Sequence, residues 1–552
     1  MRAAVTARLG KCGWLPLVVG YAVALLLCPP GRDFAILDDW IYLRSVADLF
    51  AGGGLHPADY AQVTLVTHTL WGATWDAVCG YSFTALTYAN LAAALVASLA
   101  CYALLRQLAV SPRRSLLGAA LLSLNPLFVL HAYSYMTDIT YLACLLLATL
   151  LYLKGTQRAS VLLLLLASLC AALAFLSRQF GLALPLVVAA VTLSQPYLQA
   201  VGGSIGKWRR LVAVLALPGL AAAGYLLWRS SFGPSWSSSY QQLAIHELVS
   251  DPLRALVDRA LYVGGSLPLL GLSVPLWGWP RRRWLLLLTL PVVAAAVYFA
   301  PKPLPLVVYP EADSLSPFGL EATPLWWLGL PLAALLCANL LERGGEFAAH
   351  LLAAARWHRP PSLPASLPLT ATAALTFAGT VLVSRPFFSR YYLVLLPALI
   401  YLAVAERGKL EGRERQAGAV AGWQWGLLAA LAVVSFALHT DSYAYNATRW
   451  RAGRDLLAHG VAIEQVDNGY AWAGYYLYEV AVQRLGSSSV VVAGIFAPSK
   501  LIDPLYIVGA ARAGGPALPL RPPVTSYRVV ARYHWFSLLA PGWQEVAVWQ
   551  RQ

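Results

Sequence analysis

Charged residues are scarce in this chain. Asp, Glu, Lys and Arg make up 12% of its 552 residues, about half of the roughly 25% found in ordinary soluble domains. Hydrophobic residues make up 59%, and the mean hydropathy is +0.61. This composition excludes a typical soluble protein and predicts a polytopic membrane protein.

Acidic residues are fewer than basic ones, 25 against 40, which gives a net charge of +15. A positive balance can indicate nucleic-acid binding. Here the basic residues lie in short loops between apolar runs, where the positive-inside rule places them. The charge therefore indicates membrane topology, and we expect no nucleic-acid partner.

Several motifs are also missing. The seven cysteines are scattered, with neither metal-ligand spacing nor a disulfide framework. There is no glycine-rich nucleotide-binding loop. The first apolar run follows three basic residues, and no clear small-residue cleavage site comes after it, which predicts a retained anchor.

Apolar runs long enough to cross a membrane recur along the chain. A spanning helix needs about 20 apolar residues, within a range of about 17–25. The sequence predicts about thirteen transmembrane helices, at 12–28, 83–105, 115–131, 138–153, 161–176, 180–194, 211–228, 261–278, 284–300, 324–341, 367–384, 391–405 and 422–438.

The basic residues orient these helices. If the N-terminus lies inside, the inner loops contain 21 Lys and Arg, the outer loops 9 and the region after residue 440 the remaining 10. This bias predicts an external loop at 29–82 and an extracytoplasmic C-terminal region. Within the loop, Trp40, Leu43, Val46 and Phe50 recur at helical spacing, which predicts an amphipathic helix at the membrane interface.

The chain divides into two predicted domains, an all-α transmembrane domain at 1–439 and a small extracytoplasmic α/β domain at 440–552. In the second, residues 446–460 have a helical pattern, and strands are predicted at 462–469, 526–539 and 544–550. An aromatic-rich stretch, "GYAWAGYYLYE", could stack on a sugar or fill a small core. We expect this domain to tune access of an acceptor.

Acidic and arginine residues from distant segments are predicted to meet at the outer rim. Asp38 and Asp39 come from "FAILDDWIYLRSV", Asp138 follows a later apolar run, and Arg178 and Arg390 end or begin others. Arginines can hold a phosphate, and a carboxylate can accept a proton. A simpler reading has Arg178 reaching to the interface and Asp138 only capping a helix.

Four short motifs resemble the GT-C class of membrane glycosyltransferases, which includes the family 39 protein O-mannosyltransferases and the lipid A aminoarabinose transferases. They are "DDWIY" at 38–42, "MTD" at 136–138, "SRQFGLALPL" at 177–186 and "SRYYLVLLP" at 389–397. The resemblance implies a GT-C fold with Asp38 as the base, Asp39 where Glu is usual and Asp138 as a supporting acid. It implies donor binding by Arg178, Gln179, Arg390 and Tyr391.

The chain departs from this class in its first loop. Aminoarabinose transferases have a lysine there at the donor phosphate, whereas residues 45–84 contain neither Lys nor Arg. His68 is the nearest replacement. A divalent metal, if the reaction uses one, would be bound by Asp38, Asp39 and Asp138.

The resemblance implies an inverting transfer of a sugar from a polyprenyl-phosphate donor to a lipid, glycan or protein acceptor. The protein would lie among the lipids of a bacterial inner membrane, with its active site outside. One alternative is a transporter or flippase of lipid-linked saccharides, which would have charges near the midplane and paired broken helices. Another is a non-catalytic cell-envelope assembly protein.

Overall fold

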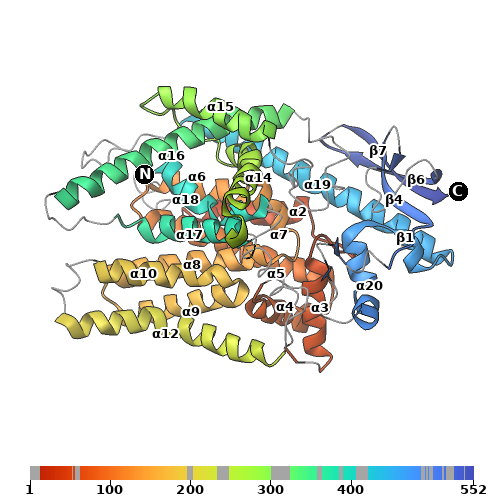
Figure 1. Cartoon of the computed structure of the whole chain (residues 1–552), viewed down its shortest axis with the longest axis horizontal. Coiled ribbons are helices and arrows are strands. Elements are labelled where there is room, and N and C mark those ends of the chain that lie inside the picture. Colours follow the sequence, from red (N-terminus) through yellow and green to blue (C-terminus); the bar gives the residue numbers. More distant parts are fainter. Residues whose placement is uncertain are drawn as a thin grey trace, which may run out of the picture.

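The computed structural model describes residues 13–552 except 53, 56–62, 195–202, 233–245, 247, 300–323, 357–363, 384–388, 406–419, 486–490, 493–494, 497–500, 513–514, 517–526 and 540. The protein is mostly helical, with a bundle of helices and a small sheet at one end of the long axis (Figure 1). The longer helices are α2 (Leu15–Leu27), α3 (Asp39–Phe50), α4 (Val66–Cys79), α5 (Phe83–Gln107), α6 (Pro112–Ser123), α7 (Pro126–Ala132), α8 (Thr137–Gln157), α9 (Val161–Ser177), α10 (Ala183–Ser194), α12 (Gly203–Ser230), α14 (Pro252–Ser273), α15 (Trp284–Phe299), α16 (Pro324–Arg356), α17 (Leu367–Val383), α18 (Leu396–Val404), α19 (Gly422–Ala458) and α20 (Gly469–Leu485). Short 3₁₀ segments are η1 (Gln179–Leu182), η5 (Ser389–Val394) and η7 (Ile463–Gln465).

Every predicted apolar run overlaps a helix of the structure. By length and composition, five helices of the described chain can cross a membrane by themselves: α5, α8, the Gly206–Ser230 part of α12, α14 and α19. Together α6 and α7 form a sixth candidate, bent by 60°. The protein is thus a multi-pass membrane protein, while thirteen crossings remain a prediction.

The bend between α6 and α7 has a local cause. Pro126 cannot donate the backbone hydrogen bond that would continue α6. The Asn125 side chain instead accepts a hydrogen bond from the backbone N–H of Leu127 and caps a new helix. The second helix therefore starts in a new direction, which leads the chain to Asp138 at the start of α8.

Helix α3 confirms the helix predicted in the first loop. The residues spaced along it, Trp40, Leu43 and Val46, are buried, whereas Phe50 is 54% exposed. Ile41 and Tyr42 are buried as well, because α4 and α20 pack against α3. The helix is thus covered by protein on more than one side, and its placement at a membrane interface remains a prediction.

Helix α19 is longer than expected. The predicted transmembrane run at 422–438 and the predicted helix at 446–460 are one continuous helix of 37 residues, about 55 Å long at 1.5 Å per residue. The boundary predicted at residue 439 therefore falls inside a helix. Figure 1 shows α19 running from the bundle to the C-terminal sheet.

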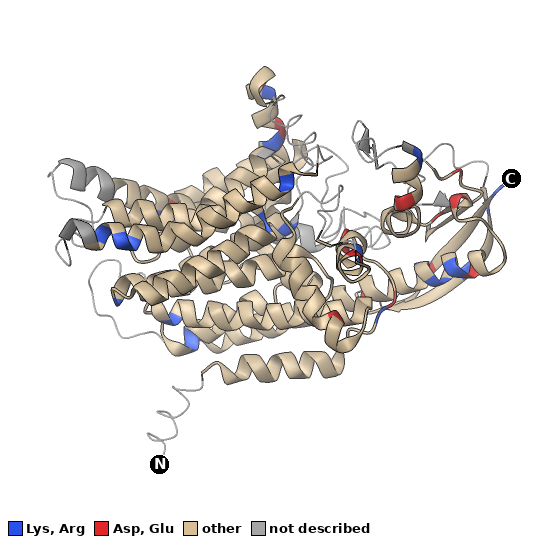
Figure 2. Ribbon diagram, turned by 90° about the horizontal axis from the view of Figure 1, so that it is seen from below, with Lys and Arg blue, Asp and Glu red and all other residues tan. Residues whose placement is uncertain are grey.

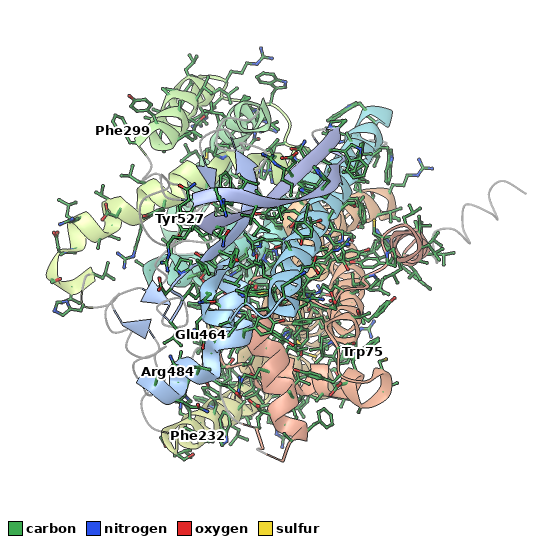
Figure 3. The ribbon with its side chains drawn as sticks, turned by 90° about the vertical axis from the view of Figure 1, so that its right-hand side faces the viewer. Trp75, Phe232, Phe299, Glu464, Arg484 and Tyr527 are labelled. Carbon is green, nitrogen blue, oxygen red and sulfur yellow. The ribbon has the colours of Figure 1, made fainter. Side chains whose placement is uncertain are left out.

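The C-terminal sheet is built on α19, which contacts β4 (Tyr506–Arg512), β6 (Tyr527–Ser537) and β7 (Gly542–Arg551). The strand order is β1-β4-β7-β6, with β5 (Gly515–Pro516) beside β4. Strand β1 (Val466–Asp467) pairs parallel to β4, and the other neighbours are antiparallel. A separate two-stranded ladder joins β2 (Val491–Val492) to β3 (Ile495–Phe496). Figure 3 views this end of the molecule.

Two of the predicted strands are confirmed as β6 and β7. The prediction at 462–469 was wrong for most of its length, because η7 occupies its first half and β1 has only two residues. The aromatic stretch forms α20, in which Trp472 is fully buried against Trp450 of α19. At this position the aromatic residues fill a core.

Candidate active site

Asp39 lies in a buried ion pair. Its Oδ2 is 2.6 Å from Nη2 of Arg32, and neither side chain is exposed. Its Oδ1 accepts a hydrogen bond from the backbone N–H of Ile36 at 2.7 Å. Although Arg32 opposes the effect, burial raises the pKa of Asp39. Asp39 therefore holds the loop before α3 together through Arg32 and Ile36, and its side chain faces the protein interior.

Asp38 faces a different environment from its neighbour. Leu37, directly before it, has φ 59°, a left-handed conformation that is strained for a branched side chain. The Asp38 side chain is 17% exposed. Asp38 and Asp39 are consecutive residues at the start of α3 and therefore project about 100° apart, one into a partly open site and one into the protein interior.

Two donors bind the Asp38 carboxylate. Arg390 donates from Nη1 to Oδ2 at 3.1 Å, and Tyr470 donates from its hydroxyl to Oδ1 at 2.6 Å. Arg390 belongs to η5 and Tyr470 to α20. The site therefore combines the first loop, a segment before α18 and the part of the chain after α19, which comprises α20 and the sheet and is called the C-terminal unit below.

A second acid–arginine pair lies nearby. Asp138, in the first turn of α8, forms an ion pair with Arg178, which follows the end of α9. Met136 is the N-cap residue of α8, and the carboxylate of Asp138, two residues further on, has Arg178 as its partner. Arg178 lies over protein rather than reaching alone to an interface, since its side chain is 15% exposed.

Two tyrosines connect the pairs. The Tyr391 ring lies 5.9 Å from the guanidinium carbon of Arg178 and 5.8 Å from that of Arg390. Tyr42 interacts electrostatically with both pairs, and burial raises its pKa. Four charges from segments far apart in the sequence thus gather around two aromatic rings.

A narrow pocket opens beside these groups. Its solvent-accessible volume is about 20 Å³, room for about one water molecule. Asp138, Arg178, Arg390 and Tyr391 line it, together with the hydroxyl-bearing Tyr141, Thr376 and Thr380 and with apolar side chains. Gln179 begins η1 directly after Arg178 and is not among the lining residues.

His68 lies behind the site. It is fully buried, its Nδ1 is 2.9 Å from the hydroxyl of Thr140, and its ring stacks on Tyr135 at 4.0 Å. Burial lowers the pKa of His68 to about 3. A neutral imidazole cannot replace the charge of a lysine at a phosphate, so this placement favours packing behind Tyr42, whose ring lies 5.7 Å away.

The three predicted aspartates do not fit a metal site. Each has an arginine partner, namely Arg390, Arg32 and Arg178 for Asp38, Asp39 and Asp138. No group of three His, Cys, Asp or Glu side chains comes together anywhere in the described part of the chain.

Sequence reasoning missed two residues of this arrangement. Arg32 carries no local signal for its role beyond its place in the first loop, seven residues before Asp39, which allows the two side chains to pair. Tyr470 is one of several tyrosines in the aromatic stretch. Nothing in the sequence distinguishes it, because its contact with Asp38 depends on the docking of α20.

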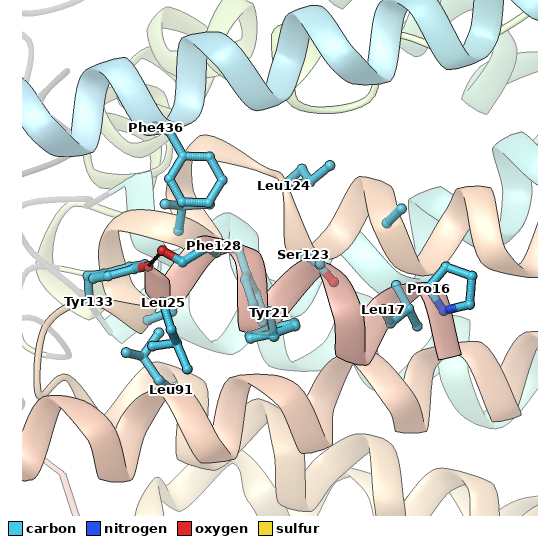
Figure 4. Close-up of a pocket in the computed structure, with 15 residues that line it drawn as sticks. Pro16, Leu17, Tyr21, Leu25, Leu91, Ser123, Leu124, Phe128, Tyr133 and Phe436 are labelled. Atoms are coloured by element: carbon cyan, nitrogen blue, oxygen red, sulfur yellow. Dashed lines mark hydrogen bonds between the residues drawn. The ribbon is translucent and has the colours of Figure 1, made fainter. Parts of the chain in front are cut away.

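A larger apolar pocket lies elsewhere, between α2, α5, the α6–α7 bend and α19 (Figure 4). Its volume is about 120 Å³. Tyr133, at one end, donates to the backbone carbonyl of Ala24 at 3.3 Å. Its described lining contains no charged side chain, so acid–base chemistry belongs at the acid–arginine site instead.

The fold and this site define a class, that of multi-pass helical membrane proteins with paired carboxylates and guanidiniums at helix ends. Residues 71–228 match the sequence model of the family described as dolichyl-phosphate-mannose-protein mannosyltransferase. The chain is therefore similar to this family of membrane glycosyltransferases, which confirms the resemblance inferred from the motifs. The matched segment contains Asp138 and Arg178, whereas Asp38 and Arg390 lie outside it.

Solved structures give a weaker likeness. ArnT from Cupriavidus metallidurans in the apo state is 16% identical, with 89% of this chain and 77% of that chain covered and a TM-score of 0.37. The same enzyme bound to undecaprenyl phosphate is also 16% identical, with 97% of both chains covered and a TM-score of 0.36. At these TM-scores no residue role is transferred. No curated protein sequence matches the chain.

Proposed function

We propose that the protein is an inverting GT-C-type glycosyltransferase that uses a polyprenyl-phosphate sugar donor. The observation that carries the proposal is the meeting of two acid–arginine pairs around Tyr391. The family similarity over residues 71–228 supports the same reaction class. No second function is favoured by a specific contact.

In this proposal Asp38 is the base. An acceptor hydroxyl or amine attacks the anomeric carbon, and its proton passes to Asp38. The bond from that carbon to the phosphate oxygen breaks, and the electron pair leaves with the polyprenyl phosphate. Because a phosphate is a good leaving group, one base suffices.

Arg178 and Arg390 would bind the donor phosphate. A guanidinium has five N–H donors in a planar fork that matches phosphate geometry, so Arg390 can contact a carboxylate and a phosphate together. Asp138 would orient Arg178. The acceptor could be a lipid, a glycan or a protein.

The proposed site lies on the extracytoplasmic side of a bacterial inner membrane. Figure 2 shows basic positions at the helix ends far from the C-terminal sheet as well as around the sheet, and acidic positions mainly on the side of the bundle that carries the sheet. This distribution agrees with the charge bias of the loops.

The test is sugar transfer by purified protein from a synthetic polyprenyl-phosphate sugar. Asp38→Asn keeps the shape and removes the proton acceptor, so the rate should fall by about 10²–10⁴ while donor binding survives. A variant that transfers sugar within a factor of a few of the parent would rule out Asp38 as the base.

A further inference from the structure

The contact between Tyr470 and Asp38 joins residues 432 positions apart in the sequence. An aspartate carboxyl rotates easily about its last torsion. Here one oxygen accepts from Tyr470 and the other from Arg390. Donors on both oxygens fix the plane of the carboxylate.

The place of Tyr470 is set by close packing of α20 on α3. At Gly474, an added Cβ would lie 2.3 Å from Cε2 of the Trp40 indole. Only glycine allows the two helices to approach this closely. The Trp40 ring also contacts Tyr470 and Tyr478, with centroids 6.4 and 5.2 Å away.

Contacts with α19 also hold the start of α20 in place. Gly469, with φ 76°, begins the helix directly before Tyr470. The preceding Asn468 is fully buried and donates from Nδ2 to the backbone carbonyl of Arg449 at 3.1 Å. Trp472 is fully buried two residues beyond Tyr470. The tyrosine therefore projects from a well-packed turn.

We propose that Tyr470 is a positioning residue for Asp38, so that the C-terminal unit completes the active site. This inference rests on the proposed function. The Tyr470 hydroxyl aligns the carboxylate for the incoming acceptor. The C-terminal unit therefore contributes to the chemistry as well as to acceptor access.

The test compares Tyr470→Phe with Tyr475→Phe in the purified full-length protein. Tyr475 lies on the same helix, packs on Phe83 and Trp450, and is 44% exposed. Loss of a hydrogen bond to a charged group should lower kcat about 10-fold to 100-fold in Tyr470→Phe. The donor KM should change little.

The split between kcat and the donor KM separates positioning from structural damage, because a disrupted site would also lose donor binding. Tyr475→Phe should leave both kcat and the donor KM unchanged. A kcat in Tyr470→Phe equal to that of the parent would overturn the proposal.

A second readout does not depend on transfer. A water-soluble carbodiimide modifies accessible carboxyls, and peptide mass spectrometry measures the extent at Asp38. Modification should rise severalfold in Tyr470→Phe and stay at the parental level in Tyr475→Phe. An inactive parent with this difference would refute the proposed function and support the contact, whereas equal modification in all three proteins would refute the contact itself.

Discussion

Arg32 and Asp39 lie where neither charged group reaches water, so each depends on the other for stabilisation. Removing one partner of a buried pair leaves an uncompensated charge, which typically costs about 3–5 kcal/mol. We expect Asp39→Asn to lower the free energy of unfolding by about this amount, and the melting temperature in detergent measures it.

The matched control is Asp33→Asn. Asp33 pairs with Arg454, but its side chain is 73% exposed, and exposed pairs contribute about 0–1 kcal/mol. Its melting temperature should stay close to that of the parent. If Asp39→Asn melts normally yet transfers no sugar, Asp39 belongs to the chemistry instead.

The arginines of the site give a second prediction at the residue scale. Lysine keeps the charge of Arg178 or Arg390 but loses the planar fork that binds a phosphate through two parallel hydrogen bonds. We expect each Arg→Lys variant to weaken donor binding about tenfold, measured with a labelled polyprenyl-phosphate sugar. Unchanged donor affinity in both variants would remove the arginines from the donor site.

At the scale of elements, Asp441 connects α19 to the end of β6. Its carboxylate is fully buried and accepts from the hydroxyl of Ser537 and the backbone N–H groups of Leu538 and Leu539. Asp441→Ala leaves these donors without their acceptor, at about 1–3 kcal/mol for each buried group. We expect faster hydrogen exchange at 537–539, measured by mass spectrometry.

Asp503→Ala is the control for this prediction. Asp503 pairs with Arg551, but its side chain is 80% exposed, so exchange at the end of β6 should not change. Equal exchange rates in the Asp441 variant and the parent would mean that the helix and the sheet are held together by other contacts.

At the scale of the whole molecule, the prediction concerns orientation. Cys79, at the end of α4, is exposed and belongs to the predicted external loop, whereas Arg283 belongs to a predicted inner loop. A membrane-impermeant maleimide should label Cys79 in intact cells. In a Cys79→Ser background, Arg283→Cys should be labelled only after permeabilisation, and labelling of both in intact cells would refute the topology.

The membrane part of the fold could be predicted because apolar runs are long and local in sequence. A helix such as the one at 83–105 can be predicted from hydropathy alone. The C-terminal unit was harder, since β1 is two residues long and β4 was not recognised. A two-residue strand depends on its neighbour for its hydrogen bonds, and no local pattern encodes that.

The same distinction applies to the site. The sequence could identify four charged residues of the site, because a charge beside an apolar run is costly unless it is paired or takes part in function. They are Asp38, Asp138, Arg178 and Arg390, and their catalytic roles remain predictions. The partners of Asp38 and Asp39 include Arg390 and Arg32, and those contacts arise only when the chain folds. The sequence separates the two acids only through the family resemblance, which makes Asp38 the base.

The span of the Tyr470–Asp38 bond has a consequence for biosynthesis. A chain is made from its N-terminus, so Asp38 enters the membrane long before Tyr470 leaves the ribosome. Until α20 is translated, exported and docked on Trp40, the proposed base lacks one of its two donors. Premature chains that end before α20 would then hold an unfinished site, and sugar transfer would begin only after about seven-eighths of the chain, up to Leu485, has been made.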